Sequence, residues 1–187
     1  MSEHELIQRA RQGDQAAWER LVRLHQEPAF RLAYLMLGDA DAADDVAQET
    51  FIRAFRALDR FDASRPLRPW LLRITTNLAY NQRRAVGRYL AVLRRIFADD
   101  PHPAPSADAA AGSTWEAQAI WQAIRHLSHA DQEIIYLHYF LELSVVETAE
   151  TLGVAPGTVK SRRHRALERL REIVAREFPG LGEEHPA

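Results

Sequence analysis

The sequence predicts an all-α protein made of two small helical domains joined by a flexible linker. Apolar residues recur at spacings of three and four along most of the chain, which is the period of an amphipathic helix. We find no run with the pattern of a β-strand and no internal repeat. Residues 99–113 contain three prolines and little that could form a core, which indicates an exposed linker. We therefore expect domains over residues 1–96 and 114–178, with the linker over 97–113.

The composition is that of a soluble globular protein, with 47% hydrophobic and 27% charged residues. The absence of cysteine excludes a disulfide framework and a thiolate metal site. No apolar run approaches the ~18 residues that a membrane span needs, and the N-terminal residues lack the apolar core of a signal peptide. We expect a cytoplasmic protein without membrane insertion.

The formal net charge of −2 conceals a strong asymmetry along the chain. Residues 39–62 hold seven acids and three arginines, whereas residues 73–95 hold six arginines and no acid. Residues 156–176 hold seven basic residues and two acids. Two separate basic segments on an acidic chain favour two contacts with a polyanion over two solvated helix faces.

In the first domain, the apolar residues of segment 46–61 form one helical stripe that includes Phe51, Ala54, Phe55 and Leu58. An upstream helix is expected to end at Gly38-Asp39. The next helix is expected to begin around Asp41–Asp45, because acidic residues suit a helix N-terminus. A further helix is predicted over about 67–85, with prolines near its start, where they are tolerated.

In the second domain, two short helices flank a tight turn. In the first, Val145, Val146, Ala149 and Leu152 are expected on one face. Gly153 suits a helix end with positive φ, and Pro156 suits the first position of the next helix. Val159 would fill the space at the angle between the two helices. This is the helix-turn-helix pattern, in which the second helix enters the DNA major groove.

The second helix of this pattern is strongly basic, which suits phosphates and guanine edges. The residues at its start that could reach base edges are Thr158, Lys160, Ser161, Arg162 and Arg163, with Arg165 and Arg169 further along for backbone contact. The alternative is a basic surface helix on an ordinary helical hairpin.

In the first domain, segment 70–84, WLLRITTNLAYNQRR, places a tryptophan, polar amides and paired arginines on one predicted helix. Single-stranded nucleic acid needs such a combination of charge and aromatic rings. The pattern is weak by itself, since a tryptophan such as Trp70 is more often a core residue than a platform for a base, and the arginine run is also explained as a solvated surface.

Two blocks of the sequence resemble a known family. DDVAQETFIRAFRALDRFD (44–62) and PWLLRITTNLAYNQRR (69–84) resemble region two of bacterial RNA polymerase sigma factors, and segment 127–172 resembles their region four. Region three is absent, and this layout resembles the extracytoplasmic-function (ECF) group. The resemblance extends from about Leu6 to Ile173.

The resemblance implies a factor that joins core RNA polymerase and directs it to promoter DNA. The helix at 44–61 would dock on the polymerase clamp through Asp45, Gln48, Glu49, Arg53 and Arg56, while Phe51, Ala54, Phe55 and Leu58 hold the core. Segment 64–84 would melt the minus-ten element and capture a flipped base near Asn77. The other DNA-binding residues expected in this segment and just after it are Trp70, Arg73, Asn81, Arg83, Arg84 and Arg88. The helix-turn-helix would bind the minus-thirty-five element, and an anti-sigma factor is an expected further partner.

Two positions depart from the family pattern. Asn81 stands where many members have Asp, which removes a negative charge beside DNA. Thr148 stands where an Ile-like residue is usual, at an expected cost in packing.

Nothing in the sequence indicates catalysis, a cofactor or a metal site. The eight histidines are scattered, the pair Asp44-Asp45 lies at a helix start, and no Gly-rich phosphate loop or nucleophile elbow is found. Two other functions stay open: a stand-alone helix-turn-helix transcriptional regulator, and a protein–protein adaptor without DNA binding.

Overall fold

In the computed structural model, residues 1–96 and 115–179 are described, and every regular element in these ranges is helical. The chain divides into two units, Met1–Ser106 and Ala107–Ala187. The expected linker over 97–113 lies outside the described residues.

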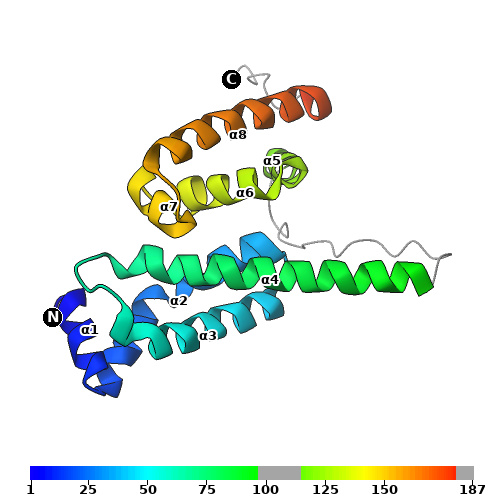
Figure 1. Ribbon diagram of the computed structural model, residues 1–187. Helices are drawn as coiled ribbons and strands as arrows, with labels where there is room; N and C mark the ends of the chain where they lie inside the picture. The colour runs from blue at the N-terminus through cyan, green and yellow to red at the C-terminus, as the bar shows by residue number, and fades with distance from the viewer. Residues whose placement is uncertain (97–114, 180–187) are drawn as a thin grey trace. The chain divides into compact units, whose positions relative to one another are not determined.

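Within residues 1–96, unit 1 consists of four α-helices, which Figure 1 labels, and one 3₁₀ turn. The elements in order are α1 (Glu3–Arg11), α2 (Gln15–Leu37), α3 (Ala40–Ala57), η1 (Leu58–Arg60) and α4 (Leu67–Ile96). Helices α2, α3 and α4 pack on one another, and α1 packs on α2. The predicted all-α class is confirmed.

The helix boundaries of unit 1 follow from local capping. Gly38 ends α2 in the left-handed conformation, with φ of 71°, and its N–H donates to the Tyr34 carbonyl. Asp39 then caps α3 by accepting from the Ala42 N–H at 2.7 Å. The predicted break at Gly38-Asp39 is therefore confirmed, although α3 begins at Ala40, slightly earlier than the acidic cluster suggested.

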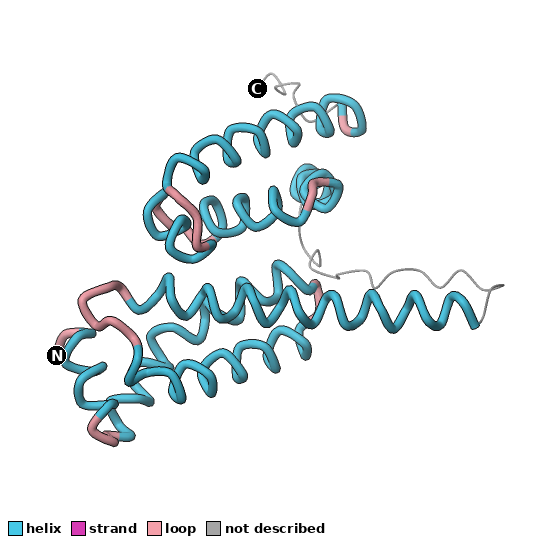
Figure 2. The backbone as a smooth tube through the Cα atoms, in the orientation of Figure 1, coloured by secondary structure: helices cyan, strands magenta, loops and turns pink. Residues whose placement is uncertain are grey.

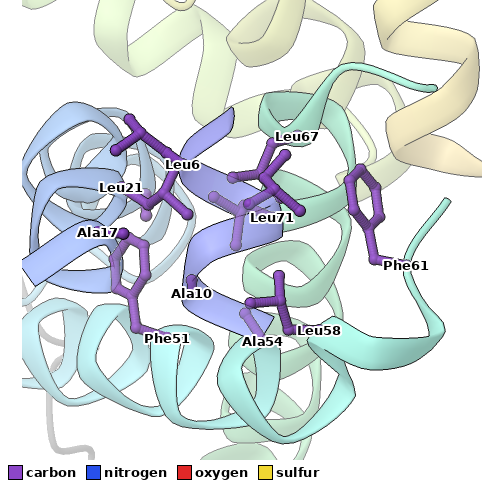
Figure 3. Close-up of a cluster of buried hydrophobic side chains, with 12 residues drawn as sticks. Leu6, Ala10, Ala17, Leu21, Phe51, Ala54, Leu58, Phe61, Leu67 and Leu71 are labelled. Atoms are coloured by element: carbon purple, nitrogen blue, oxygen red, sulfur yellow. The ribbon is translucent and has the colours of Figure 1, made fainter. Parts of the chain in front are cut away.

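The core of unit 1 is built from α1, α2, α3, η1 and the start of α4 (Figure 3). Its buried side chains are Leu6, Ile7, Ala10, Ala17, Leu21, Ala29, Phe51, Ala54, Leu58, Phe61, Leu67 and Leu71. The expectation for Phe55 is wrong, since this ring is 52% exposed. One helical residue turns the side chain by ~100°, so Phe55 lies at the margin of the stripe that Ala54 centres, and the Trp18 ring approaches it to 5.2 Å between centroids.

Helix α4 is longer than predicted and continues from residue 85 to Ile96. Alanine, leucine and arginine in this stretch are strong helix formers. Gly87 interrupts them without ending the helix, because an isolated glycine costs only about 1 kcal/mol relative to alanine.

The segment between η1 and α4 is held by side chains of α1. The Arg11 guanidinium donates to the carbonyls of Leu58 and Phe61, and the His4 ring lies 3.1 Å from the Ala63 carbonyl. Within the segment, Asp62 accepts from the N–H and hydroxyl of Ser64 at 3.0 and 2.7 Å. These Ser64 hydrogen bonds, hydroxyl first, hold the pKa of Asp62 below its usual range, and the nearby arginines add to the effect.

We expect Asp62→Asn to lower the stability of unit 1 slightly at pH 7 and to have little effect under strongly acidic conditions. The pKa of Asp62 is lowered by folding, so the ionised group stabilises the folded state above the ordinary Asp pKa. This contribution disappears as the pH falls through the lowered folded-state pKa. Urea midpoints of both proteins at pH 7 and near pH 3 test the prediction. A difference that grows on acidification would contradict it.

Over the described residues 115–179, unit 2 contains four α-helices and one π-helical turn, all drawn as helix in Figure 2. The elements in order are α5 (Trp115–His126), α6 (His129–Ile135), the π turn η2 (Tyr136–Phe140), α7 (Val145–Leu152) and α8 (Pro156–Glu177). Helix α8 packs against α5, α6 and α7.

Helices α7 and α8 form the predicted helix-turn-helix. Gly153 has φ of 67° and donates its N–H to the Ala149 carbonyl, and Pro156 opens α8. Ala149 and Val159 are buried together with Ile134 of α6, so the small alanine and the valine at the helix angle have the predicted places. Val146, by contrast, is 59% exposed and was wrongly assigned to the packed face.

Two buried polar residues of unit 2 are satisfied inside the fold. Thr148 is fully buried, and its hydroxyl donates to the Ser144 carbonyl at 2.8 Å, so the hydroxyl does not remain unpaired. Asp131 on α6 accepts from the Arg169 guanidinium at 2.5 Å and from the Ser128 hydroxyl at 2.8 Å. The Asp131–Arg169 ion pair fastens α8 to α6.

Candidate nucleic-acid interface

A polar face runs along α4 of unit 1. Spacings of three and four residues place Trp70, Arg73, Asn77, Asn81, Arg84 and Arg88 on this α4 face. From Asn77 onward, and at Arg73, these side chains are exposed. At 1.5 Å per residue the face is about 27 Å long. The structure thus brings most of the predicted minus-ten residues onto one surface.

The remaining predicted residues of α4 differ in their surroundings. Trp70 is partly buried, and its ring centroid lies 4.7 Å from that of Phe61, so it takes part in the core packing of unit 1. Arg83 lies off the α4 face, 3.5 Å from the Met36 carbonyl. The Arg84 guanidinium lies 5.8 Å from the centre of the Tyr80 ring, at a distance that allows a cation–π contact.

In unit 2, the outer side of α8 is exposed and basic. Lys160, Ser161 and Arg165 are exposed on this α8 face, and Arg162 and Thr158 are half-buried at its margins. The first turn of α8 contains no acid. The free N–H groups of a helix N-terminus and the cationic side chains therefore favour the approach of phosphate.

Arg163 is placed differently from its neighbours. It lies on the same side of α8 as the buried Val159 and Ala166, and its Nη1 atom is 2.8 Å from Nε2 of His138. The guanidinium is directed toward η2 within unit 2. The structure therefore separates Arg163 from the exposed residues with which the sequence grouped it.

The predicted polymerase-binding residues lie along α3. Asp45, Gln48, Arg53 and Arg56 are exposed and Glu49 is half-buried. Arg53 and Glu49 form an ion pair at 2.6 Å, and the Gln48 amide donates to Asp44 at 2.6 Å. The charged side chains among these α3 residues therefore carry both signs, and Glu49 and Arg53 neutralise each other.

Apolar side chains accompany these charges. Ile52 is 45% and Phe55 52% exposed on α3, and Phe30 of α2 is 36% exposed. A groove between α2 and α3 is lined by Val22, Gln26, Glu27, Phe30, Asp44, Ala47, Gln48, Phe51 and Ile52. Exposed apolar groups in a groove with a polar margin are typical of a protein-binding surface.

Sequence reasoning missed three exposed residues on these surfaces. Tyr80 of α4 is 44% exposed beside the polar α4 face, Ile52 is exposed on α3, and His164 lies on the outer side of α8. His164 could have been recognised from the sequence, because it lies four residues after Lys160 and this spacing places both side chains on the same side of a helix. Ile52 could not be recognised, since an isolated apolar residue gives no sign of exposure in the sequence.

In the described ranges, no group of three or more His, Cys, Asp or Glu side chains could hold a metal ion. Over the same residues, no helix combines the length and apolar character required to cross a bilayer.

Two family models match this chain. Residues 21–89 match Sigma-70 region 2, and residues 117–170 match Sigma-70, region 4. The first match covers α3 and most of α4, and the second covers the helix-turn-helix. The fold and the two matched regions define a transcription initiation factor of the sigma-70 class.

Individual relatives show which group of sigma-70 factors this chain is similar to. The chain is 35% identical over 178 residues to ECF RNA polymerase sigma factor SigW of Bacillus subtilis, covering 89% of this chain and 93% of SigW. The structure of CnrH in complex with the cytosolic domain of CnrY has a TM-score of 0.66 at 29% identity, covering 94% of this chain and 98% of that one. RpoE of Bartonella quintana, in complex with the anti-sigma factor NepR, has a TM-score of 0.65 at 27% identity, with coverages of 85% and 97%.

The chain belongs to the ECF family of RNA polymerase sigma factors. Its function is accordingly to direct promoter-specific initiation of transcription. The alternative of a stand-alone helix-turn-helix regulator is not favoured, because the region 2 match in unit 1 has no place in such a protein.

Proposed function

We propose that the two units divide promoter recognition between them, with unit 1 also binding core RNA polymerase. Residues 1–96 form the first functional domain, 97–113 the linker and 114–178 the second domain. The observation on which this rests is the presence of an exposed cationic helix face in each unit, on α4 and on α8.

Core polymerase is bound through α3. Its exposed residues Asp45, Gln48, Arg53 and Arg56, with Glu49, provide charge complementarity and therefore specificity, and the apolar Ile52 and Phe55 provide burial. The internal Glu49–Arg53 ion pair is surface-exposed and worth little to folding. Its charges are consequently available to re-pair across an interface.

The minus-ten element is bound along the polar α4 face. Arg73, Arg84 and Arg88 contact phosphates, and Asn77 and Asn81 lie between them, where amides can hydrogen-bond an unstacked base. Flipping a base costs a few kcal/mol, which the contacts with the open strand must offset. Trp70 lies at one end of this surface and contributes mainly through packing. Arg83 contributes from the flank of the surface.

The minus-thirty-five element is bound by α8 in the major groove. Lys160, Ser161, Arg162 and Thr158 are close enough to its start to reach base edges, and Arg165 contacts the DNA backbone. A Cβ atom added to Gly157, which follows Pro156, would have no neighbouring atom within 4 Å. The first turn of α8 therefore leaves room for the approach of DNA.

An anti-sigma factor is a further partner. The structural relatives CnrH and RpoE were both solved as complexes, the first with the cytosolic domain of CnrY and the second with the anti-sigma factor NepR. By analogy, this protein is held inactive by such a partner until a signal releases it. It acts in the cytoplasm without an enzymatic activity of its own, and the polymerase supplies the catalysis.

The decisive test is reconstituted transcription. Purified protein is added to core RNA polymerase, binding is measured by co-elution, and run-off transcripts are mapped from genomic duplex DNA. The proposal expects a holoenzyme that initiates at defined sites. A protein that binds DNA alone and does not co-elute with core polymerase would instead be a stand-alone regulator. A protein whose binding is insensitive to salt would be an adaptor.

Two substitutions are expected to separate the promoter functions. Asn77→Ala should reduce open-complex formation while core binding stays intact, because this side chain faces away from the unit 1 core. Arg162→Ala should weaken binding of the upstream element by a factor of about 10, the value of one good contact to a base edge. Permanganate footprinting measures the first effect, and duplex binding measures the second.

The matched controls for these variants lie outside the proposed surfaces. Gln12→Ala on the end of α1 removes an exposed amide, and Arg171→Ala removes an exposed arginine beyond the first turns of α8. Both controls should behave like the wild type. If Asn77→Ala lowers the affinity for core polymerase, the base-binding surface has been placed wrongly.

A further inference from the structure

His138 on η2 contacts two segments of unit 2 at once. Its Nδ1 atom lies 2.8 Å from the Leu143 carbonyl, and its Nε2 atom lies 2.8 Å from Nη1 of Arg163. The first contact reaches the loop that leads into α7. The second reaches α8. One side chain therefore connects the segment before the helix-turn-helix with its second helix.

These two partners determine the protonation of the His138 ring. A carbonyl can only accept, so Nδ1 must donate to Leu143. A guanidinium can only donate, so Nε2 must accept from Arg163. Both conditions are met by the neutral ring with its proton on Nδ1. A positively charged ring would place two donors opposite each other.

The loop that His138 contacts has an unusual backbone. Within the described part of the chain, Glu142 is the one non-glycine residue with positive φ, at 56°. Left-handed conformations are unfavourable for such residues and persist where neighbouring contacts hold them. The Leu143 N–H donates to the Leu137 carbonyl at 3.0 Å, and its carbonyl accepts from His138. The bond from His138 thus completes the support of the loop immediately before the Ser144 cap of α7.

Arg163 lies on the face of α8 that packs against the rest of unit 2. It follows the buried Val159 by four residues and precedes the buried Ala166 by three, so the three share one face. Val159 packs against α6 and α7 through Ile134 and Ala149. The hydrogen bond to His138 adds a directional contact to this apolar packing, which by itself is non-directional.

We propose that His138 is a positioning residue for promoter recognition, and that Arg163 acts through it instead of contacting DNA bases. The neutral His138 ring fixes Arg163 and the loop at Leu143, which sets how α8 is presented to the major groove. This inference rests on the proposed function of α8 as the minus-thirty-five-binding helix. It amends the sequence-based assignment of Arg163 as a DNA contact.

Two substitutions of His138 each keep one of its two hydrogen bonds and remove the other. In His138→Gln the side-chain amide oxygen can reach the place of Nε2 and accept from Arg163. In His138→Asn the shorter amide can only replace Nδ1 and donate to Leu143. Each variant loses one bond, so each is the stability control of the other. We expect the full-length Gln variant in holoenzyme to bind an upstream-element duplex within about threefold of the wild type, and the Asn variant to bind about tenfold more weakly.

The salt dependence of binding distinguishes positioning from direct contact. Removing one phosphate contact reduces the slope of log affinity against log salt by about 1. Arg163→Ala should weaken binding with an unchanged slope, and its effect should largely vanish in the His138→Asn background. The comparison variant is Arg165→Ala, an exposed cation on the same helix, which should reduce the slope. A reduced slope for Arg163→Ala, or full additivity with His138→Asn, would overturn the inference.

A spectroscopic measurement tests the ring directly. The ¹⁵N shifts of the His138 ring in the full-length protein at neutral pH should show a protonated Nδ1 and an unprotonated Nε2, and Arg163→Ala should change the Nε2 signal. The opposite tautomer would contradict the proposed contacts. If the wild-type holoenzyme binds no upstream-element duplex, the proposed function of α8 fails. If it binds and the Gln and Asn variants are equivalent, only the role of His138 fails.

Discussion

Ile134→Ala is expected to destabilise unit 2 by about 2–5 kcal/mol and to abolish recognition of the upstream promoter element at physiological temperature. Ile134 is fully buried and packs with Ala149 and Val159, the two residues that hold α7 against α8. Truncation removes apolar burial and leaves a cavity that the helices can only partly fill. A small domain with a total stability of about 5–15 kcal/mol loses a large share of it.

The effect should be confined to unit 2. Hydrogen exchange followed by mass spectrometry on the full chain reports on peptides of each unit separately, and faster exchange is expected across α6, α7 and α8. Ile120→Ala on α5 makes the same chemical change at a side chain that is 41% exposed, and should have a much smaller effect. Equal effects of the two substitutions would show that the helix-turn-helix core has been assigned wrongly.

Leu71→Ala should have a comparable effect in unit 1, about 2–5 kcal/mol of destabilisation. Leu71 is 2% exposed and lies where the first turns of α4 meet the core shared with α1, α2 and α3 (Figure 3). Its loss loosens the helix that presents Arg73 and Asn77. We therefore expect both core polymerase binding and promoter opening to fall, while the upstream-element binding of α8 is retained.

The control for Leu71→Ala is Leu24→Ala, since Leu24 on α2 is 54% exposed. Surface substitutions of this kind usually change stability by no more than about 0.5 kcal/mol. Hydrogen exchange of the α4 peptides at increasing urea concentrations compares the stabilities of the two variants. A Leu71 variant that unfolds like the wild type while losing promoter opening would mean that this leucine acts at the DNA surface and not in the core.

The helix-turn-helix shows how much local sequence can determine. Gly153 and Pro156 each have a conformational preference that needs no tertiary contact, and their spacing fixed both the end of α7 and the start of α8. The break at Gly38-Asp39 is a second case, where a left-handed glycine and a capping carboxylate act within a few residues.

Positions at the edge of an apolar stripe were less predictable. Phe55 and Val146 fit the helical period, yet both are mostly exposed, because the width of the buried stripe depends on which helices pack beside it. The Trp18 ring packs beside Phe55 without burying it, and Val146 lies exposed in the first turn of α7. Periodicity gives the centre of a buried face and leaves its margins to tertiary packing.

The sequence by itself determined that this chain is an all-α protein with a helix-turn-helix and two cationic helices, and the resemblance of its two blocks indicated the family that the comparisons confirm. Helical period, capping residues and charge are local properties, so one-dimensional information suffices for them. The tertiary structure alone decided which cations face outward. Arg163 and Arg162 are adjacent in the sequence, but only Arg163 meets His138, because an acceptor 25 residues away must be folded against α8 before the difference exists.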